Sequence, residues 1–593
     1  MTSSNGEKAP SKDVKESSLR SFLAKLRKRH IIETLAAFIG GGWLIIEVVH
    51  FILIGHYHFP EKALDITIAT LFGSLLCTLI WRWFSGREAP RKFKLELVLI
   101  PLVVLITVLL DINLLLHLKR PGPETFAAPK WKNSIAVLPF DDISPQKDQD
   151  YFCEGLADSI IHALNSIKEI RVPGRDSARY LKGKGLSIQE IGRKLNVSVA
   201  LDGSIQKAGD KLRVTALLTN VDDNSVLWSD QYNKELKDVF SIQDEITLAI
   251  VDKMKIQLLG DNKAKLTKRP TENLDAYNSY LLGRYWLNKL SEEGYHKAIG
   301  YFEQAIAKDP SYTLAYVGLA NCYAFLGHDG YIAPKEGYLK ARAAALTAIE
   351  LDKELADAHA MLGIIKHVFE WDIPGAELEF QRALKLSPNS RDVYFNYSLF
   401  MSETGGFDEA IAGCKRIIEL DPASAANIYN LGQNGYSTAG RFDEAIVQLK
   451  KSLEMDPNFF YAQISLAFNY GFKGMYAEAI AQAEKVVATQ PQTEDPYLLG
   501  TLGWVYAVSG RQEIARKFLD LLLSIRARRY FDAYYIVYIY KGLGDKVKTF
   551  EWLNRGYEEH ACCLVWLKTD PMMKNLRSDP RYKEILKKMG WEK

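Results

Sequence analysis

The acidic side chains that could do chemistry are grouped most tightly at four positions: Asp141, Asp142, Asp148 and Asp150. Carboxylates are the ligands that hard divalent cations prefer, so one interpretation of this group is a metal site. Ser144 and Pro145 lie between the two pairs and are typical of turns. These turn residues favour the other interpretation, a solvated loop.

A nucleophile or a phosphate-binding loop is harder to find. Cys153 has no histidine at a fixed spacing that could activate its thiol. The glycines over 155–209 match neither a phosphate loop nor a dinucleotide-binding fingerprint. His56 and His58, with His50 nearby, could ligate a metal, but one His-x-His pair is weak evidence. We therefore expect no enzymatic activity, no cofactor and no metal.

Composition and cysteine usage exclude further classes. The net charge is +3, from 75 basic and 72 acidic residues, which gives no reason to expect nucleic-acid binding. The six cysteines form no Cys-x-x-Cys pair, which argues against zinc ribbons and thioredoxin-like chemistry. Cys562 and Cys563 could form a strained vicinal disulfide or remain two buried thiols.

Three long apolar runs follow a polar and basic tail over residues 1–30. The runs cover about 31–54, 63–84 and 95–118. A helix needs about 20 apolar residues to cross the hydrocarbon core of a bilayer. The pattern therefore predicts a membrane anchor of three transmembrane helices over residues 31–118.

Several ionisable residues fall within these runs, among them the acids Glu47, Asp65 and Asp111. An ionisable side chain in the membrane is costly, which makes each a candidate functional residue. In one interpretation the acids face the helix bundle and share hydrogen bonds with His50 or His117. In the other they couple a signal to a cytoplasmic partner.

The basic residues predict the orientation of the anchor. Lysines and arginines are concentrated in the tail and in the loop over 82–94, whereas the first loop has only Lys62. Loops rich in lysine and arginine stay in the cytoplasm. We expect a cytoplasmic N-terminus, with everything after the linker over 119–132 outside the cytoplasm.

Short apolar runs and helical patterns alternate over residues 133–260, which predicts a small α/β domain. Ser187 and Glu190 have the spacing of a capping box at the start of a helix over 188–195. Gly209 lies in the turn of an expected hairpin. The strands are expected at 134–140, 170–173, 198–206, 211–219 and 226–232, and further helices at 150–168 and 238–258.

Two stretches of this domain resemble a known family. They are SIAVLPFDDISPQKDQDYFCEGLADSIIHAL and LDGSIQKAGDKLRVTALLTNVDDNSVLWSDQY. They are similar to the domain related to the TolB amino-terminal domain and to the flagellar assembly protein FlgO. The resemblance implies a bacterial chain, and hence an inner-membrane anchor with periplasmic domains.

In bacteria that domain commonly lies between an output module and tetratricopeptide repeats. The output module is often a class III adenylyl cyclase or a winged-helix regulator of the CadC type. Only 30 residues precede the first apolar run, and neither module fits in that length. The resemblance therefore implies an architecture without cyclase activity or DNA binding.

An internal repeat with a period of about 34 residues covers 272–560. A small residue recurs at Ala298, Ala341, Ala376, Ala410, Ala445, Ala479, Ala515 and Thr549. Turn glycines are expected at Gly327, Gly406, Gly440, Gly474, Gly510 and Gly544. The spacing resembles the tetratricopeptide repeat, which implies about eight helix pairs stacked into a superhelix with an extended concave surface. The segment over 328–340 is an insertion that predicts a longer loop.

The first helix of each repeat would line a groove for protein or peptide partners. The candidate groove residues are Phe395, Leu399, Asn430, Asn434, Tyr461, Ile464, Phe468, Tyr497, Trp504, Tyr534 and Tyr538, with Phe531 beside them. The alternative is that these aromatic side chains pack between repeats. Residues 561–593 are amphipathic and predict a segment that caps the last apolar face.

The fold class expected from these observations has three parts: three transmembrane helices, a small α/β domain and an all-α solenoid. The leading functional interpretation is a membrane-anchored scaffold or adaptor for protein partners. The alternatives are a transmembrane sensor and, with least support, an enzyme of unknown activity. The partners expected are proteins or peptides and the lipid bilayer, not nucleic acid, and a homo-oligomer is left open.

Overall fold

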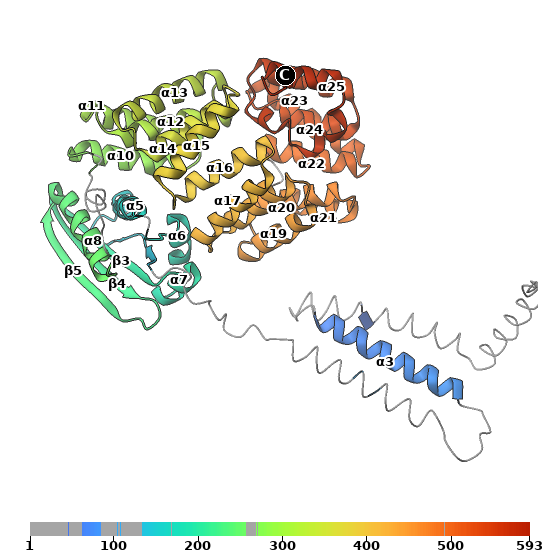
Figure 1. Ribbon diagram of the computed structural model, residues 1–593, viewed down its shortest axis with the longest axis horizontal. Helices are drawn as coiled ribbons and strands as arrows, with labels where there is room; N and C mark the ends of the chain where they lie inside the picture. The colour runs from blue at the N-terminus through green and yellow to red at the C-terminus, as the bar shows by residue number, and fades with distance from the viewer. Residues whose placement is uncertain are drawn as a thin grey trace, which may run out of the picture. The chain divides into compact units, whose positions relative to one another are not determined.

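The computed structural model describes residues 45–46, 62–84, 104, 107, 133–167, 169–256, 269, 271–490 and 493–592 (Figure 1). The chain divides into two compact units, Met1–Thr125 and Phe126–Lys593. Each unit is described by itself.

The first unit contains helix α3 (Lys62–Phe84), which coincides with the apolar run over 63–84. Asp65 lies in this helix, whereas Glu47, Asp111 and the histidines at 50, 56 and 58 lie outside the described residues. Most of the runs over 31–54 and 95–118 lie outside them too. Within the described ranges, no helix combines the length and the apolar character that a membrane crossing requires.

A five-stranded mixed sheet forms the centre of the α/β domain. The strands β1 (Ile135–Val137), β3 (Val199–Ala208), β4 (Lys211–Asn220) and β5 (Val226–Glu235) lie in that order, and β2 (Asp141–Asp142) also pairs with β3. The pairs of β1 and β2 with β3 are parallel, and the other two pairs are antiparallel. The hairpin expected around Gly209 is confirmed, with a positive φ of 60° at that glycine.

Helices cover both faces of this sheet. The alternation along β3 sends Val199 and Leu201 to one face, under α5 (Asp150–Asn165) and α8 (Val239–Lys253). It sends Ala200 to the other face, under α6 (Arg175–Gly183) and α7 (Ile188–Leu195). The capping box of Ser187 and Glu190 at the start of α7 is confirmed.

One expectation for this domain was wrong, and one helix was missed. Residues 170–173 do not form a strand, because only Arg171 makes an isolated bridge, to Ser134. Helix α6 was not predicted, since its nine residues are mostly polar and its buried face consists only of Ser177, Ala178 and Leu181.

The rest of the second unit is a helical solenoid that begins against the sheet domain (Figure 1). Its helix pairs are α10 (Leu274–Leu287) with α11 (Glu292–Lys308), α12 (Thr313–His328) with α13 (Pro334–Leu351), α14 (Ala356–Val368) with α15 (Ile373–Leu386), α16 (Arg391–Thr404) with α17 (Phe407–Leu420), α18 (Ala425–Asn430) and η3 (Leu431–Ser437) with α19 (Phe442–Met455), α20 (Phe460–Phe472) with α21 (Tyr476–Thr489), α22 (Pro496–Val508) with α23 (Gln512–Arg528), and α24 (Tyr534–Leu543) with α25 (Lys546–Glu558).

The periodic small residues explain why the paired helices pack so closely. All seven periodic alanines and Thr549 are fully buried. Larger side chains there would push the helices apart, since protein interiors are close-packed. Gly440, Gly474, Gly510 and Gly544 have positive φ as their turn role requires. At two turns the sequence analysis predicted the wrong glycine. The residues with positive φ there are Gly330 and Gly405, not Gly327 and Gly406.

The insertion over 328–340 lengthens the loop only in part, to residues 329–333. Helix α12 ends at His328 and α13 already begins at Pro334. Pro334 is the first residue of α13 and suits a helix start. A backbone N–H at this position would have no intrahelical partner, so the N–H that proline lacks is not missed. Most of the insertion therefore lengthens α13.

The end of the solenoid packs back against its middle. After α25 the chain forms two short 3₁₀ turns, η4 (Cys562–Trp566) and η5 (Pro571–Leu576), and the helix α26 (Pro580–Lys588). The indole of Trp591 stacks on His367, with ring centroids 6.1 Å apart, and donates a hydrogen bond to the carbonyl of Trp371 at 3.2 Å. The hydroxyl of Thr569 reaches the carbonyl of Glu403. The superhelix thus closes on itself instead of staying an open, extended surface.

Candidate ligand-binding pocket

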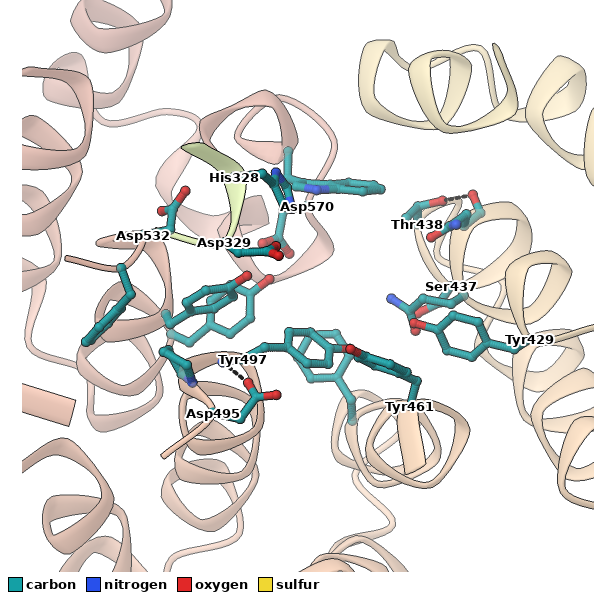
Figure 2. Close-up of a pocket in the computed structure, with 18 of the residues that line it drawn as sticks. His328, Asp329, Tyr429, Ser437, Thr438, Tyr461, Asp495, Tyr497, Asp532 and Asp570 are labelled. Carbon is teal, nitrogen blue, oxygen red and sulfur yellow. Dashed lines mark hydrogen bonds between the residues drawn. The ribbon is translucent and has the colours of Figure 1, made fainter. Parts of the chain in front are cut away.

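Closure of the solenoid creates a pocket of about 580 Å³ on its inner side (Figure 2). Its walls come from α20, α22 and α24, from η3, from the turn after α12 and from the closing segment around Asp570. The lining residues are Leu290, His328, Asp329, Tyr331, Tyr429, Gln433, Asn434, Ser437, Thr438, Tyr461, Phe468, Asp495, Pro496, Tyr497, Arg529, Phe531, Asp532, Tyr535, Tyr538, Trp566, Asp570 and Pro571. This size is typical of pockets that take small molecules or single side chains.

Aromatic side chains from successive repeats form one side of the pocket. The ring centroids of Tyr461 and Tyr497 are 6.0 Å apart, and those of Tyr497 and Tyr535 are also 6.0 Å apart. Phe468 and Tyr538 continue the row, at 6.1 Å from each other. The rings meet because the repeat places the same face of α20, α22 and α24 side by side.

Four carboxyl groups line the pocket, and each accepts hydrogen bonds from neutral donors. Asp495 caps α22 by accepting from the backbone of Tyr497 and Leu498. Asp329 accepts from the hydroxyl of Tyr295 at 3.0 Å. Within the described part of the chain, none of the ion pairs involves Asp329, Asp495, Asp532 or Asp570.

The two most buried of these acids lie beside the closing segment. Asp532 is 4% exposed and accepts from the backbone amides of Tyr534 at 2.8 Å and Cys563 at 2.7 Å. Asp570 is 5% exposed and accepts from the amide of Met572 at 2.8 Å and the hydroxyl of Tyr534 at 3.1 Å. Burial raises the pKa of Asp570 to about 6 and also raises the pKa of Asp532.

The opposite wall carries neutral polar groups on an unusual backbone. Residues Leu431–Ser437 form a π-helical turn, a feature often found at functional sites. Gln433, Asn434, Ser437 and Thr438 line the pocket from this wall. The Oε1 atom of Gln433 is buried and has no hydrogen-bond partner in the described structure. Figure 2 shows Ser437 and Thr438 across the pocket from Asp329, Asp532 and Asp570.

The structure separates the candidate groove residues into three groups. Asn434, Tyr461, Phe468, Tyr497, Phe531 and Tyr538 line the pocket. Ile464, Trp504 and Tyr534 are buried in the core between repeats, as the alternative interpretation expected. Phe395, Leu399 and Asn430 are half-buried and do not line it.

Sequence reasoning missed the acids of the pocket. Asp495 precedes Pro496 and has the pattern of an ordinary helix cap. Asp329 and Asp570 are far apart in the chain, and only closure of the solenoid brings their segments to one pocket. A signal was nevertheless present, because Asp495, Asp532 and Asp570 all lie at a turn just before a helix.

The other residues singled out in the sequence have structural partners. Asp141 pairs with Lys182 at 2.9 Å, and Asp142 accepts from the backbone amides of Ser144 and Gln149 at 2.8 Å each. These bonds fit the turn interpretation of the aspartate group. In the ranges that the structure covers, no three histidine, cysteine or acidic side chains are placed to hold a metal ion.

The cysteines of the chain are free thiols where they are described. Cys562 is buried and Cys563 is half-buried, with its sulfur 3.6 Å from the hydroxyl of Tyr535. Burial raises the pKa of both thiols, so they stay protonated and are poor nucleophiles.

Comparison with known families supports the repeat. A family model described as "Tetratricopeptide repeat" matches residues 426–459, which span the pair of η3 and α19. The chain therefore contains tetratricopeptide repeats, built as a helical solenoid with a small sheet region.

Curated relatives match only part of the chain. It is 29% identical over 201 residues to "Putative adenylate cyclase 3" of Rhizobium meliloti, covering 34% of each protein. It is 31% identical over 164 residues to "Transcriptional regulator HilA" of Salmonella typhimurium, covering 27% of this chain and 29% of that one. The chain thus spans about a third of the length of the curated relatives that it matches.

Among solved structures, the chain is similar to PilW, described as a widely conserved type IV pilus biogenesis factor. The match has a TM-score of 0.32 and 18% identity, and covers 38% of this chain and 97% of that one. The relation to the TolB amino-terminal domain and the membrane anchor stay predictions from the sequence.

Proposed function

We propose that this protein is a non-enzymatic scaffold or adaptor that binds a protein or peptide partner through its tetratricopeptide repeats. The observation that carries the proposal is the row of aromatic side chains from α20, α22 and α24 that faces a pocket. Tyr461 is 43% exposed at this row, so its ring is accessible to a partner. Solenoids of helix pairs use such inner faces to hold peptide segments.

A photo-crosslinking amino acid at Tyr461 tests this function in cells. The matched control is the same amino acid at Tyr476, which is 45% exposed on α21 and does not line the pocket. We expect a discrete crosslinked protein from position 461 that is absent from position 476. Crosslinks that are the same at both positions, or absent at 461, would contradict a partner bound at the inner face.

We also propose that the apolar runs over 31–54, 63–84 and 95–118 anchor the chain in a bacterial inner membrane, with the N-terminus in the cytoplasm. The length of the runs and the basic loop over 82–94 support this proposal. Reporter fusions after residue 130 test it. Alkaline phosphatase should be active there and green fluorescent protein dark, whereas the reverse result would place the second unit in the cytoplasm.

A sensor is the second candidate function. Two curated relatives carry the names of a cyclase and a transcriptional regulator, which supports a signalling role for shared segments. In this version Glu47, Asp65 and Asp111 transmit the signal through the anchor. Replacing the three acids by their amides should abolish signalling without loss of partner crosslinking, and full signalling in that variant would exclude the sensor.

A further inference from the structure

The charges that line the pocket are unbalanced. Four carboxyl groups face it, whereas its cationic candidates are Arg529 and His328. The guanidinium of Arg529 donates to the carbonyl of Glu494 at 3.0 Å and is exposed. None of the ion pairs in the described ranges uses the four acids, so each of these carboxyls, where it is ionised, lacks a salt-bridge partner from the chain. A ligand of opposite charge would supply the missing partner.

The aromatic row supports the same sign of ligand independently of the acids. A cationic side chain of the protein lies over many of its aromatic rings. The guanidinium carbon of Arg581 is 4.0 Å from the ring centroid of Phe550, and the amine of Lys297 is 3.9 Å from that of Trp286. Within the described residues, no such contact involves the tyrosines of the pocket or Phe468. Aromatic rings that carry no cation of the chain and lie beside carboxylates are the surroundings in which proteins hold ammonium and guanidinium groups.

The geometry distinguishes an organic cation from a metal ion. A metal ion needs at least three ligands around one point, and no group of three acidic, histidine or cysteine side chains in the described ranges meets that need. The carboxyls are instead spread around a pocket of about 580 Å³, large enough for an alkyl chain that ends in a charged group. The unpartnered Oε1 of Gln433 on the opposite wall can accept a hydrogen bond from the same ligand.

We propose that this pocket binds an organic cation, a protonated alkylamine or a guanidinium group, between the four carboxyls and the row of tyrosines. The cation belongs either to a free small molecule or to a lysine or arginine side chain of a bound peptide. The proposal deepens the proposed binding function and, in its peptide form, rests on it. The acids attract the charge, the rings cover the alkyl part, and Gln433 with its neighbours binds neutral polar groups.

Calorimetric titration of the full chain at low ionic strength tests the proposal. The probes are N-acetyl-arginine amide and spermidine, and the neutral control is N-acetyl-norleucine amide. We expect the two cations to bind and the norleucine compound to bind at least about tenfold more weakly, since a hydrogen bond to a charged group contributes roughly a factor of ten or more. No binding of either cation, or equal binding of the norleucine compound, would overturn the proposal.

Asp329→Asn is the first variant, because this side chain is exposed and its amide keeps an acceptor for Tyr295. It should weaken the binding of both cations about tenfold. Asp520→Asn makes the same charge change on α23, away from the pocket, and should leave binding unchanged. Equal effects of the two variants would mean a general charge effect and would overturn the site. Asp570→Asn, with its fold verified by circular dichroism, repeats the test at the buried acid.

Two further experiments are needed. The first distinguishes a peptide from a free amine as the source of the cation, and the second distinguishes the cation site from the proposed scaffold function. A peptide Ac-Ala-Arg-Ala-NH₂ that binds more tightly than spermidine assigns the cation to a protein partner, and the reverse order assigns it to a free amine. Competition by N-acetyl-arginine amide against the crosslink at Tyr461 links the cation site to the partner. Cation binding without any crosslink would contradict the scaffold alone, and a crosslink without cation binding would contradict the cation site alone.

Discussion

The hydroxyl of Ser177 in α6 donates a hydrogen bond of 2.7 Å to the carboxylate of Asp421, which follows α17 in the solenoid. Ser177 and Asp421 are both almost fully buried. The sheet domain and the repeats therefore share a polar contact inside one compact unit. Asn389 adds a second bond, from its side-chain amide to the carbonyl of Ile170 at 3.2 Å.

Replacement of Arg171 should weaken this junction. Arg171 is 0% exposed, and its guanidinium donates to the carbonyls of Glu419, Leu420, Leu195 and Asn196. Arg171→Met keeps much of the volume but leaves these carbonyls and the nearby Asp421 without their cation, so we expect a loss of about 3 kcal/mol in the free energy of unfolding. Urea denaturation of the second unit measures this loss.

The control variant is Arg193→Met. Arg193 is exposed on α7, so its replacement should change the free energy of unfolding by less than about 0.5 kcal/mol. Hydrogen exchange should also rise in 419–421 and 195–197 for the Arg171 variant only. Similar losses in both variants would mean that the junction contributes nothing specific.

The stability of the junction should depend on pH through Asp421. Burial raises the pKa of this carboxyl to about 6, although Ser177, Arg391 and Arg171 and the backbone amide of Ala423 act in the opposite direction. A carboxyl whose pKa is raised in the folded state stabilises that state while both states are protonated. This contribution is complete below about pH 4 and is lost as the pH rises through 6, with a magnitude of about 3 kcal/mol.

The variant Asp421→Asn isolates that effect, because the amide keeps an acceptor for Ser177 but does not titrate. Relative to the wild type, the variant should gain stability as the pH rises from 4 to 7. Unfolding midpoints in urea at each pH measure the difference. A difference between the two proteins that stays constant over this range would refute the role of Asp421.

Closure of the solenoid should depend on Trp591. Its indole stacks on His367 and donates to the carbonyl of Trp371, and the ring of Trp371 in turn stacks on His560 at 4.8 Å. Because Trp591 is half-buried, Trp591→Ala should cost about 2 kcal/mol of local stability.

Hydrogen exchange localises this loss. Backbone amides over 367–371 and 560–576 should exchange faster in Trp591→Ala, while those of the β3–β4 hairpin keep their rates. Trp591→Phe keeps a stacking ring without the hydrogen bond and should give an intermediate result. Unchanged exchange in 367–371 would show that the contact of Trp591 with His367 does not hold the solenoid closed.

The repeat was predictable from the sequence because it depends on short-range periodicity. A small residue such as Ala445 is needed once in every pair, and it is fully buried as that role requires. The turn at Gly405 was misassigned by one residue, since two adjacent glycines offer the same freedom of φ and only the structure selects one.

Closure and the pocket were not predictable in the same way. The contacts of Trp591 with His367 and of Thr569 with Glu403 join residues that are far apart and occur once, so no period reveals them. The same holds for the acids, which serve as caps locally and share a pocket only after closure. Tyr461 and Tyr497 were predictable, because they lie on the repeated inner face.

Binding of an organic cation in the pocket should weaken as the pH falls. The pKa of Asp570 is raised to about 6 by burial, while Met572, Tyr534, Arg577 and Lys541 lower it. A cation binds the ionised carboxylate and lowers its pKa, so binding releases a proton and is favoured at high pH. The affinity for N-acetyl-arginine amide should therefore fall by up to about tenfold between pH 8 and pH 5, where about one carboxyl in ten is still ionised.

Two variants identify the group responsible for that pH dependence. Asp570→Asn should bind the cation more weakly at pH 8 and should show a flatter dependence on pH. His328→Gln, which removes the imidazole that faces the same pocket, should keep the dependence of the wild type. Calorimetric titrations of the three proteins at pH 5, 6, 7 and 8 measure both effects. A dependence that disappears with His328 and persists in the Asp570 variant would assign the effect to the imidazole and contradict the role of the carboxylate.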